Sequence, residues 1–156
     1  MQILLFTGIQ GSGKTTFFKE RFFKSHVLIS LDLLKTRNRE RRFMSTCFET
    51  NARFVVDNTN PTARDRQRYI VPAKQAGYEI IGCFFDITLK EALKRNNRRA
   101  YKECIPEVGI RATFKKLQIP NLQEGYNKLF RISSSGLNYL IENLENPSKA
   151  LELPLF

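Results

Sequence analysis

A chain of 156 residues with a formal net charge of +11 is long enough for one domain with its own core and leaves little room for a second. A hydrophobic share of 42%, no apolar run of about 18 residues and a first apolar stretch too short for a secretion signal argue against a membrane segment, so we expect a single domain over residues 1–156 in the cytoplasm. Three widely spaced cysteines and one histidine argue against a disulfide framework and a zinc site, whereas the positive charge makes nucleic acid the first partner to consider.

Apolar runs and helical patterns alternate along most of the chain. The expected strands lie at residues 1–7, 27–30, 53–56, 79–85 and 128–132. The expected helices lie at residues 14–24, 33–50, 61–76 and 88–99, with two short helices after Pro106 and a C-terminal helix and apolar tail around 136–156. This alternation predicts an α/β domain of three layers, with a central, mostly parallel sheet and helices on both faces.

The first expected strand ends in the loop 8-GIQGSGKT-15, which matches the Walker A pattern between a strand and a helix. Backbone N–H groups of such a loop point at phosphates, Lys14 can reach the β- and γ-phosphates, and the Thr15 hydroxyl can ligate Mg²⁺. The residues expected to hold ATP, or another nucleoside triphosphate, are Gly8, Gly11, Ser12, Gly13, Lys14, Thr15 and Thr16. The loop therefore indicates a domain of the P-loop NTPase type.

Asp32 follows the second expected strand, in 29-ISLDLLK-35. Parallel strands end at one edge of a sheet, and ligands bind there, so this carboxylate is expected near the γ-phosphate. It could accept the proton of an attacking hydroxyl as a general base. The structural alternative is that Asp32 is the N-cap of the next helix.

Asp57 ends the third expected strand, in 57-DNTNP-61. A carboxylate at this place can bind Mg²⁺ through water, as Asp32 could also do, or it can position a substrate together with Asn58. The structural alternative is a turn formed by Asp57 with Asn58 and Asn60. We expect Asn60 to cap the following helix, with Pro61 in its first position.

Two clusters carry much of the positive charge. The first lies around 35–42, is expected to be a solvated surface, and consists of Lys35, Arg37, Arg39, Arg41 and Arg42. The second has helical spacing that predicts one shared face, and consists of Arg95, Arg98, Arg99 and Lys102. We interpret the second cluster as part of a basic lid around 94–105, whose arginines stabilise charge on the transferring phosphate.

These elements together resemble the 5′-kinase domain of phage and animal polynucleotide kinases. The resemblance rests on 8-GIQGSGKT-15, 29-ISLDLLK-35, 57-DNTNP-61, 94-KRNNRR-99 and 105-IPEVGIRATFKKLQIPNLQEGY-126, in family order. It implies that Lys14 and Thr15 bind ATP and Mg²⁺, that Asp32 deprotonates a nucleotide 5′-hydroxyl, that Asp57 lies beside the acceptor, and that Arg95 and Arg99 contact the donor phosphates.

The resemblance has two departures on the acceptor side. Lys35 matches a family arginine that holds the acceptor's neighbouring phosphate, and replaces its bidentate fork with a point charge. Leu31 stands where the family often has a basic residue. Both departures concern the affinity for the acceptor and its identity.

The expected function is ATP-dependent phosphorylation of the 5′-hydroxyl of DNA or RNA, an activity of nucleic-acid repair, with Asp32, Lys14 and Arg99 as catalytic residues. One alternative is a kinase of the same fold that phosphorylates a nucleoside or a metabolite. Another is an ATPase that nucleic acid stimulates and that needs no acceptor base at Asp32.

Overall fold

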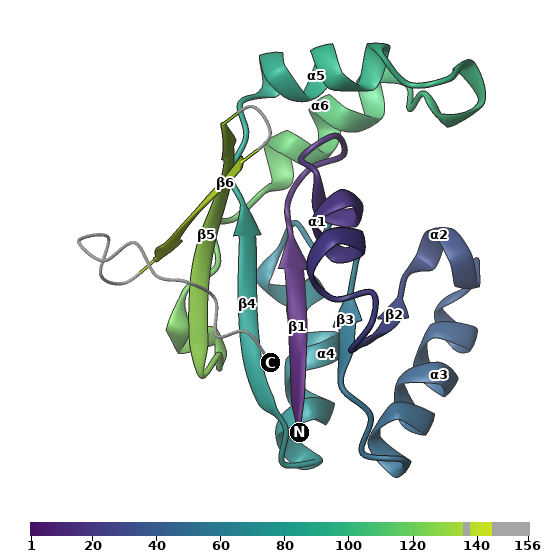
Figure 1. Ribbon diagram of the computed structural model, residues 1–156, viewed down its shortest axis with the longest axis vertical. Helices are drawn as coiled ribbons and strands as arrows, with labels where there is room; N and C mark the ends of the chain where they lie inside the picture. The colour runs from purple at the N-terminus through teal and green to yellow at the C-terminus, as the bar shows by residue number, and fades with distance from the viewer. Residues whose placement is uncertain (136–137, 145–156) are drawn as a thin grey trace.

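A six-stranded sheet runs through the middle of the protein (Figure 1). In the computed structural model, which describes residues 1–135 and 138–144, the strands are β1 (Gln2–Thr7), β2 (Val27–Ile29), β3 (Phe54–Val56), β4 (Glu79–Phe85), β5 (Lys128–Ser135) and β6 (Asn138–Asn143). Their order in the sheet is β2-β3-β1-β4-β5-β6. Each pair among the first five is parallel, whereas β6 pairs antiparallel with β5.

Helices connect the parallel strands. They are α1 (Lys14–Arg21), α2 (Leu31–Leu34), α3 (Arg37–Glu49), α4 (Ala63–Gln75), α5 (Leu89–Asn97) and α6 (Glu107–Lys116), with short 3₁₀ turns at Tyr101–Glu103 and Leu122–Glu124. Within the described residues, none of these helices has the length and apolarity that crossing a membrane requires.

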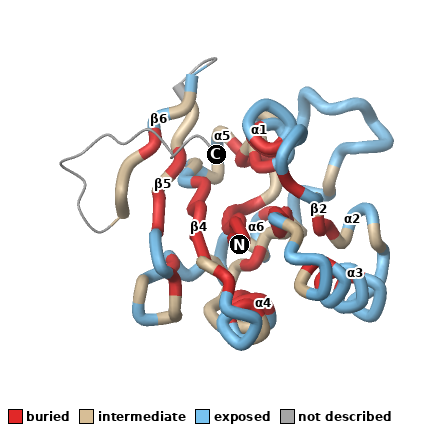
Figure 2. Tube along the Cα trace, turned by 60° about the horizontal axis from the view of Figure 1, so that its bottom comes forward, coloured by how far each residue is buried: buried red, intermediate tan, exposed pale blue. Residues whose placement is uncertain are grey.

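The two faces of the sheet bury different side chains because neighbouring residues of a strand point to opposite sides. On β1, Ile3 and Leu5 lie in a core cluster with residues of α3 and α4. Leu4 and Phe6 lie in a second cluster with Phe17 of α1. Figure 2 shows β4 mainly buried and most of α3 exposed. The predicted three-layer α/β domain of the P-loop type is therefore confirmed.

Helices α5 and α6 lie above the carboxyl ends of β1 and β4 (Figure 1). A small apolar cluster holds them to the loop after β1 through Ile9, Ala92 and Ile110. The buried Asn96 side chain donates to the Ile105 carbonyl at 2.7 Å and accepts from the Ile105 N–H at 2.9 Å. These contacts hold α5, α6 and the segment between them at the edge of the sheet where the parallel strands end.

The prediction of a single helix at residues 33–50 is wrong. The helix is interrupted at Lys35, whose φ of 67° lies in the left-handed region, and this interruption separates α2 from α3. Thr36 then starts α3 as its N-cap, accepting a hydrogen bond from the Arg39 N–H. A threonine N-cap competes locally with helix continuation, and here the cap prevails.

The helix predicted within residues 136–156 is also wrong where the structure describes the chain, because Asn138–Asn143 is the strand β6. Its burial alternates, with Ile141 packed into the core and Leu140 exposed, as expected for an edge strand with one covered face. The conformation of this segment is decided by its pairing with β5, which outweighs the local preference for a helix. The predicted tail at 145–156 lies outside the described residues.

The N-cap of α4 is Thr62 rather than the predicted Asn60. Thr62 Oγ1 accepts from the Asp65 N–H at 3.1 Å, and the Asp65 carboxylate accepts from the Thr62 N–H at 3.3 Å, which completes a capping box. Asn60 instead has a φ of 46° and donates from its buried side chain to the Phe6 carbonyl at 2.8 Å. Asn60 thus connects the segment that follows β3 to β1.

Replacing Thr62 with Ala is expected to lower the free energy of unfolding by about 1 kcal/mol, the usual cost of losing a threonine N-cap. Urea unfolding followed by circular dichroism measures this loss. Thr62→Ser keeps the hydroxyl and is the control, expected to unfold close to the wild type. Equal stability of the Ala and Ser variants would contradict the assignment of the cap.

Candidate active site

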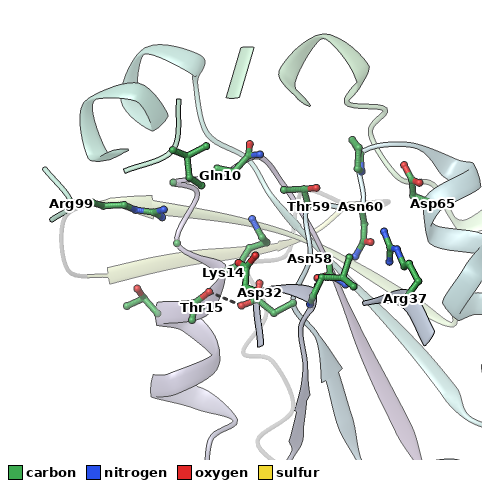
Figure 3. Close-up of a pocket in the computed structure, with 17 residues that line it drawn as sticks. Gln10, Lys14, Thr15, Asp32, Arg37, Asn58, Thr59, Asn60, Asp65 and Arg99 are labelled. Atoms are coloured by element: carbon green, nitrogen blue, oxygen red, sulfur yellow. Dashed lines mark hydrogen bonds between the residues drawn. The ribbon is translucent and has the colours of Figure 1, made fainter. Parts of the chain in front are cut away.

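A cavity of about 390 Å³ opens at the carboxyl edge of the sheet (Figure 3). Its wall is contributed by the loop after β1, by α2, by the segment after β3 and by the lid. The lining residues are Gln10, Gly11, Gly13, Lys14, Thr15, Thr16, Leu31, Asp32, Arg37, Asp57, Asn58, Thr59, Asn60, Pro61, Asp65, Arg99 and Ile105. The structure therefore gathers most of the predicted site residues into one cavity.

The glycine loop has the curled backbone that its sequence predicts. Gly11 has a φ of 80°, and a Cβ atom there would lie 2.8 Å from the Ala92 carbonyl oxygen of α5. Gly13 is the N-cap of α1 with a φ of 94°. Glycine is required at both positions because other residues rarely adopt these angles. Lys14 and Thr15 begin α1 and point toward the cavity side of the loop.

The Lys14 ammonium group lies inside the loop. Its Nζ donates to the carbonyl oxygens of Gly8 and Ile9, both at 2.9 Å, and to Ser12 Oγ at 3.3 Å. Burial lowers the pKa of Lys14 to about 8, an effect that the nearby Asp57 carboxylate partly opposes. The loop thus holds a cation with little water around it, which strengthens its attraction for a phosphate.

The lowered pKa predicts a pH dependence of stability. Between about pH 8 and the ordinary lysine value of 10.5, the unfolded chain binds more protons at Lys14 than the folded protein does. Stability from this group therefore rises as pH rises through that interval. We expect the free energy of unfolding of the wild type, measured relative to Lys14→Met, to increase between pH 8 and pH 10 in urea titrations. A difference that stays constant with pH would contradict the buried position of this ammonium.

Thr15 and Asp57 form a pair of oxygen groups below the loop. Thr15 Oγ1 donates to Asp57 Oδ2 at 2.6 Å, shown as the dashed line in Figure 3. Burial raises the pKa of Asp57, while Lys14 and the hydrogen bond from Thr15 act in the opposite direction. Hydroxyl and carboxylate oxygens are suitable ligands for Mg²⁺, which usually takes one or two protein groups together with phosphate oxygens. In the part of the chain that the structure describes, no three His, Cys, Asp or Glu side chains form a metal site of their own.

Asp32 lines the same cavity, although β3 lies between its strand and β1. It lies in the first turn of α2 and is exposed, and the N-cap of that helix is Ser30. The structural alternative for Asp32, a helix cap, is therefore not what the structure shows. Asn58 fixes the turn by accepting from the Leu31 N–H at 2.9 Å.

The lid brings one of its two predicted arginines into the cavity. Arg99 lines the cavity. Arg95 does not, because its side chain is held by Glu91 at 3.1 Å and by Ser134 Oγ at 2.7 Å. It still approaches the loop, since a Cβ atom on Gly13 would lie 3.9 Å from Arg95 Nη1.

The prediction that four lid cations share one helical face is wrong. Helix α5 ends at Asn97, so that Arg98 is its C-cap and Lys102 lies in a separate 3₁₀ turn. The charge repulsion that the continuous face would have caused is relieved by this break and by the ion pair from Arg95 to Glu91. The lid is thus a helix end followed by a turn.

The cation nearest the predicted acceptor side is Arg37 rather than Lys35. Lys35 is exposed and does not line the cavity, because its left-handed conformation turns the chain away. Arg37 lines it from the first turn of α3. The expectation that Arg37 lies on a solvated surface does not include its place beside the cavity. The sequence signal for that place is Thr36, an N-cap residue that starts a new helix. Gln10 and Asp65 are further lining residues that were not predicted.

The arrangement joins three kinds of group. Lys14 and Arg99 supply positive charge, Thr15 and Asp57 supply oxygen groups, and Asp32 supplies an exposed carboxylate. A cavity with a phosphate loop and a carboxylate of this kind can bind a nucleoside triphosphate and deprotonate a hydroxyl beside it.

Comparison with known proteins gives one family and one curated relative. A family model described as AAA domain matches residues 3–119. The bifunctional polynucleotide phosphatase/kinase of Schizosaccharomyces pombe is 25% identical over 134 residues, which cover 82% of this chain and 32% of that protein. The chain thus spans about a third of the length of this relative.

Solved structures share the fold at lower identity. A gluconokinase from Sinorhizobium meliloti superposes with a TM-score of 0.60 at 13% identity, covering 86% of this chain and 83% of that one. The APS kinase CysC of Mycobacterium tuberculosis, in complex with AMPPNP and APS, gives a TM-score of 0.55 at 18% identity, covering 86% and 89%. At these identities the likeness concerns the fold alone.

Proposed function

The chain belongs to the family described as AAA domain, and from this membership and the groups in its cavity we propose that it is a kinase that transfers the γ-phosphate of ATP to the 5′-hydroxyl of a nucleic acid. The observation that carries the proposal is that Lys14 of the phosphate loop and Asp32 line one cavity. The proposed donor site and the proposed acceptor base therefore share one cavity, which is an arrangement that phosphoryl transfer requires.

In the proposed reaction, Asp32 takes the proton of the 5′-hydroxyl group, and the oxygen of that hydroxyl group forms a bond to the γ-phosphorus. The bond between the γ-phosphorus and the bridging oxygen breaks, and ADP leaves with the electron pair. Lys14 exchanges its bonds to the loop for bonds to the β- and γ-phosphate oxygens, and Arg99 stabilises the charge that develops on them. Mg²⁺, held at Thr15 and Asp57, would supply further neutralisation of the phosphates.

Nucleic acid as the acceptor is supported by two independent features. The chain carries a net charge of +11, which favours a polyanion. The curated relative is by name a polynucleotide phosphatase/kinase, and its likeness to this chain covers 82% of the chain. The cations of α3, which begins beside the cavity, would attract the nucleic acid backbone.

A second candidate is a kinase that phosphorylates a small molecule. The proteins named gluconokinase and APS kinase have the same fold, and a cavity of about 390 Å³ has the size of ordinary small-molecule sites. A third candidate is an ATPase that nucleic acid stimulates. The third candidate needs no carboxylate at position 32.

The test is to incubate the protein with Mg²⁺ and γ-labelled ATP together with a 5′-hydroxyl oligonucleotide, a 5′-phosphorylated oligonucleotide or a mixture of nucleosides and hydroxylated metabolites. The proposal predicts label on the 5′-hydroxyl oligonucleotide alone. Label on a small molecule alone would replace it with the second candidate. Release of labelled phosphate stimulated by both oligonucleotides, without transfer, would replace it with the third.

A further inference from the structure

Arg66 is a fully buried arginine of α4 that the proposed mechanism does not use. Arginine is almost never fully buried unless it is paired, and Arg66 Nε and Nη2 donate to the two carboxylate oxygens of Glu124, both at 2.7 Å. Such a buried ion pair is weak evidence for a role in stability, because the cost of taking two charges out of water can exceed the gain from their attraction. The backbone contacts of Arg66 indicate a second role.

The remaining nitrogen of the Arg66 guanidinium group contacts the backbone at three places. Nη1 donates to the carbonyl oxygens of Asn60 at 3.1 Å, Pro61 at 3.2 Å and Gln118 at 3.0 Å. The first two carbonyls belong to segment 57–61, which follows β3, and the third follows α6. Because the donors of a guanidinium group lie in one rigid plane, Arg66 holds these carbonyls at fixed places relative to one another.

Segment 57–61 forms one wall of the cavity, and all five of its residues line it (Figure 3). Within this segment, the Asp57 carboxylate accepts from Thr15 Oγ1 at 2.6 Å. The Thr59 carbonyl oxygen accepts at 3.0 Å from the N–H of Gly8, at the start of the phosphate loop. The place of the segment therefore decides where the Asp57 carboxylate and the first residue of the loop lie.

The chain that leaves α6 is held against segment 57–61 and α4 by further hydrogen bonds. The Gln118 N–H donates to the Pro61 carbonyl at 2.8 Å, and Gln118 Oε1 accepts from the Ala63 N–H at 2.9 Å. Helix α6 lies above the edge of the sheet where the cavity opens (Figure 1). Arg66 therefore joins the wall of the cavity to the chain that leaves one of the helices above it.

We propose that Arg66 is a positioning residue for the cavity. By holding two carbonyls of segment 57–61 beside the chain that leaves α6, it fixes the place of Asp57 and supports the phosphate loop at Gly8. This rests on the proposed function and deepens it, because the geometry of transfer then depends on a residue that does not itself line the cavity. Glu124 is the counter-charge that lets the guanidinium group be buried.

The first test replaces Arg66 with Lys. The ammonium group keeps a cation beside Glu124, but as a point charge on a flexible chain it cannot hold the carboxylate and three carbonyls at once. We expect the turnover number for transfer to a 5′-hydroxyl oligonucleotide to fall by about 10- to 100-fold, because a misplacement of about 1 Å costs about 100-fold. The affinity for ATP, measured by equilibrium titration, should change far less, since Lys14 and the glycines of the loop are unchanged.

Glu124→Gln and Gln67→Ala are the matched controls. Glu124→Gln removes the negative charge but leaves Arg66 Nη1 on the three carbonyls. It should lower the free energy of unfolding in urea, because the guanidinium group loses its charged partner, while the turnover number stays close to the wild-type value. Gln67→Ala loses a 2.8 Å hydrogen bond to the Glu124 carbonyl that does not involve segment 57–61, and it should also transfer phosphate normally.

Hydrogen exchange at the Gly8 N–H, measured by NMR, reports the place of the segment without any chemistry. In Arg66→Lys we expect this amide to exchange about tenfold faster than in the wild type, the scale of weakening one hydrogen bond. In Glu124→Gln its rate should equal that of the wild type after correction for global stability. The amides of β4, which lies inside the sheet, supply that correction.

The outcomes are distinguishable. Equal losses of turnover in Arg66→Lys and Glu124→Gln, or normal turnover in a folded Arg66→Lys, would overturn the inference and leave the kinase proposal intact. If Arg66→Lys does not fold, Arg66→Met/Glu124→Gln replaces it with the same expected losses, because this double variant leaves no unpaired buried charge. If the wild type transfers phosphate to no acceptor, the proposed function fails, and exchange at Gly8 alone decides whether Arg66 positions the loop.

Discussion

Replacing Asp32 with Asn is expected to lower the turnover number for phosphoryl transfer by at least about 100-fold, the scale of losing a general base. The amide keeps the size and polarity of the side chain but cannot take the proton of the attacking hydroxyl. ATP should still bind, because the loop, Lys14 and Thr15 are unchanged. Single-turnover transfer from labelled ATP measures the chemical step, and equilibrium titration with a fluorescent ATP analogue measures binding.

The control for this variant is Asp86→Asn. Asp86 is also an exposed acid, but it pairs with Arg131 at the end of β4 and does not line the cavity. Its variant should transfer phosphate at close to the wild-type rate. Near-normal transfer by Asp32→Asn would remove Asp32 from the chemistry, and a loss of ATP binding in that variant would place Asp32 on the donor side.

Replacing Arg99 with Ala is expected to lower the turnover number by about 1,000-fold, the lower end of the range for an arginine that stabilises the transferring phosphate. Arg99 is the lid cation that lines the cavity, and its charge also acts on Lys14 to lower the pKa of that ammonium. Because the stabilised charge develops in the transition state, the turnover number should fall far more than the affinity for ATP.

Arg98→Ala is the matched control for Arg99→Ala. Arg98 is the neighbouring exposed arginine, but it caps α5 and does not line the cavity. Steady-state kinetics at saturating ATP should separate the two variants by at least two orders of magnitude. Similar losses in both variants would mean that the lid acts through its overall charge, and a change in the KM for ATP alone would make Arg99 a binding residue.

The fold could be predicted because its main strands are short apolar runs with turn signals between them. Strands β1 and β4 are buried on both faces, so their sequences are nearly continuous apolar segments. Such segments can be recognised as strands without knowing which strands pair with them. Strand β6 is different. It is an edge strand whose conformation depends on pairing with β5, and such pairing is not visible in local sequence.

The candidate site could be predicted where one local motif defines it. The loop with Lys14 and Thr15 needs only its own glycines and a flanking strand and helix. The proposed acceptor side could not be predicted in the same way, because Lys35 adopts a left-handed conformation that redirects the chain, so that Arg37 lines the cavity and Lys35 does not. A non-glycine residue with a positive φ is uncommon, and no sequence pattern predicts the left-handed conformation of Lys35.

Identifying the atom that receives the phosphate tests the central claim most directly. After reaction with γ-labelled ATP, a 5′-hydroxyl oligonucleotide of known sequence is digested to nucleoside 5′-monophosphates, and each is measured for label. We expect all label on the nucleotide that was first in the oligonucleotide, and we expect Asp32→Asn to slow this labelling by at least about 100-fold. Label on other nucleotides, on a small molecule, or on free phosphate alone would contradict the account.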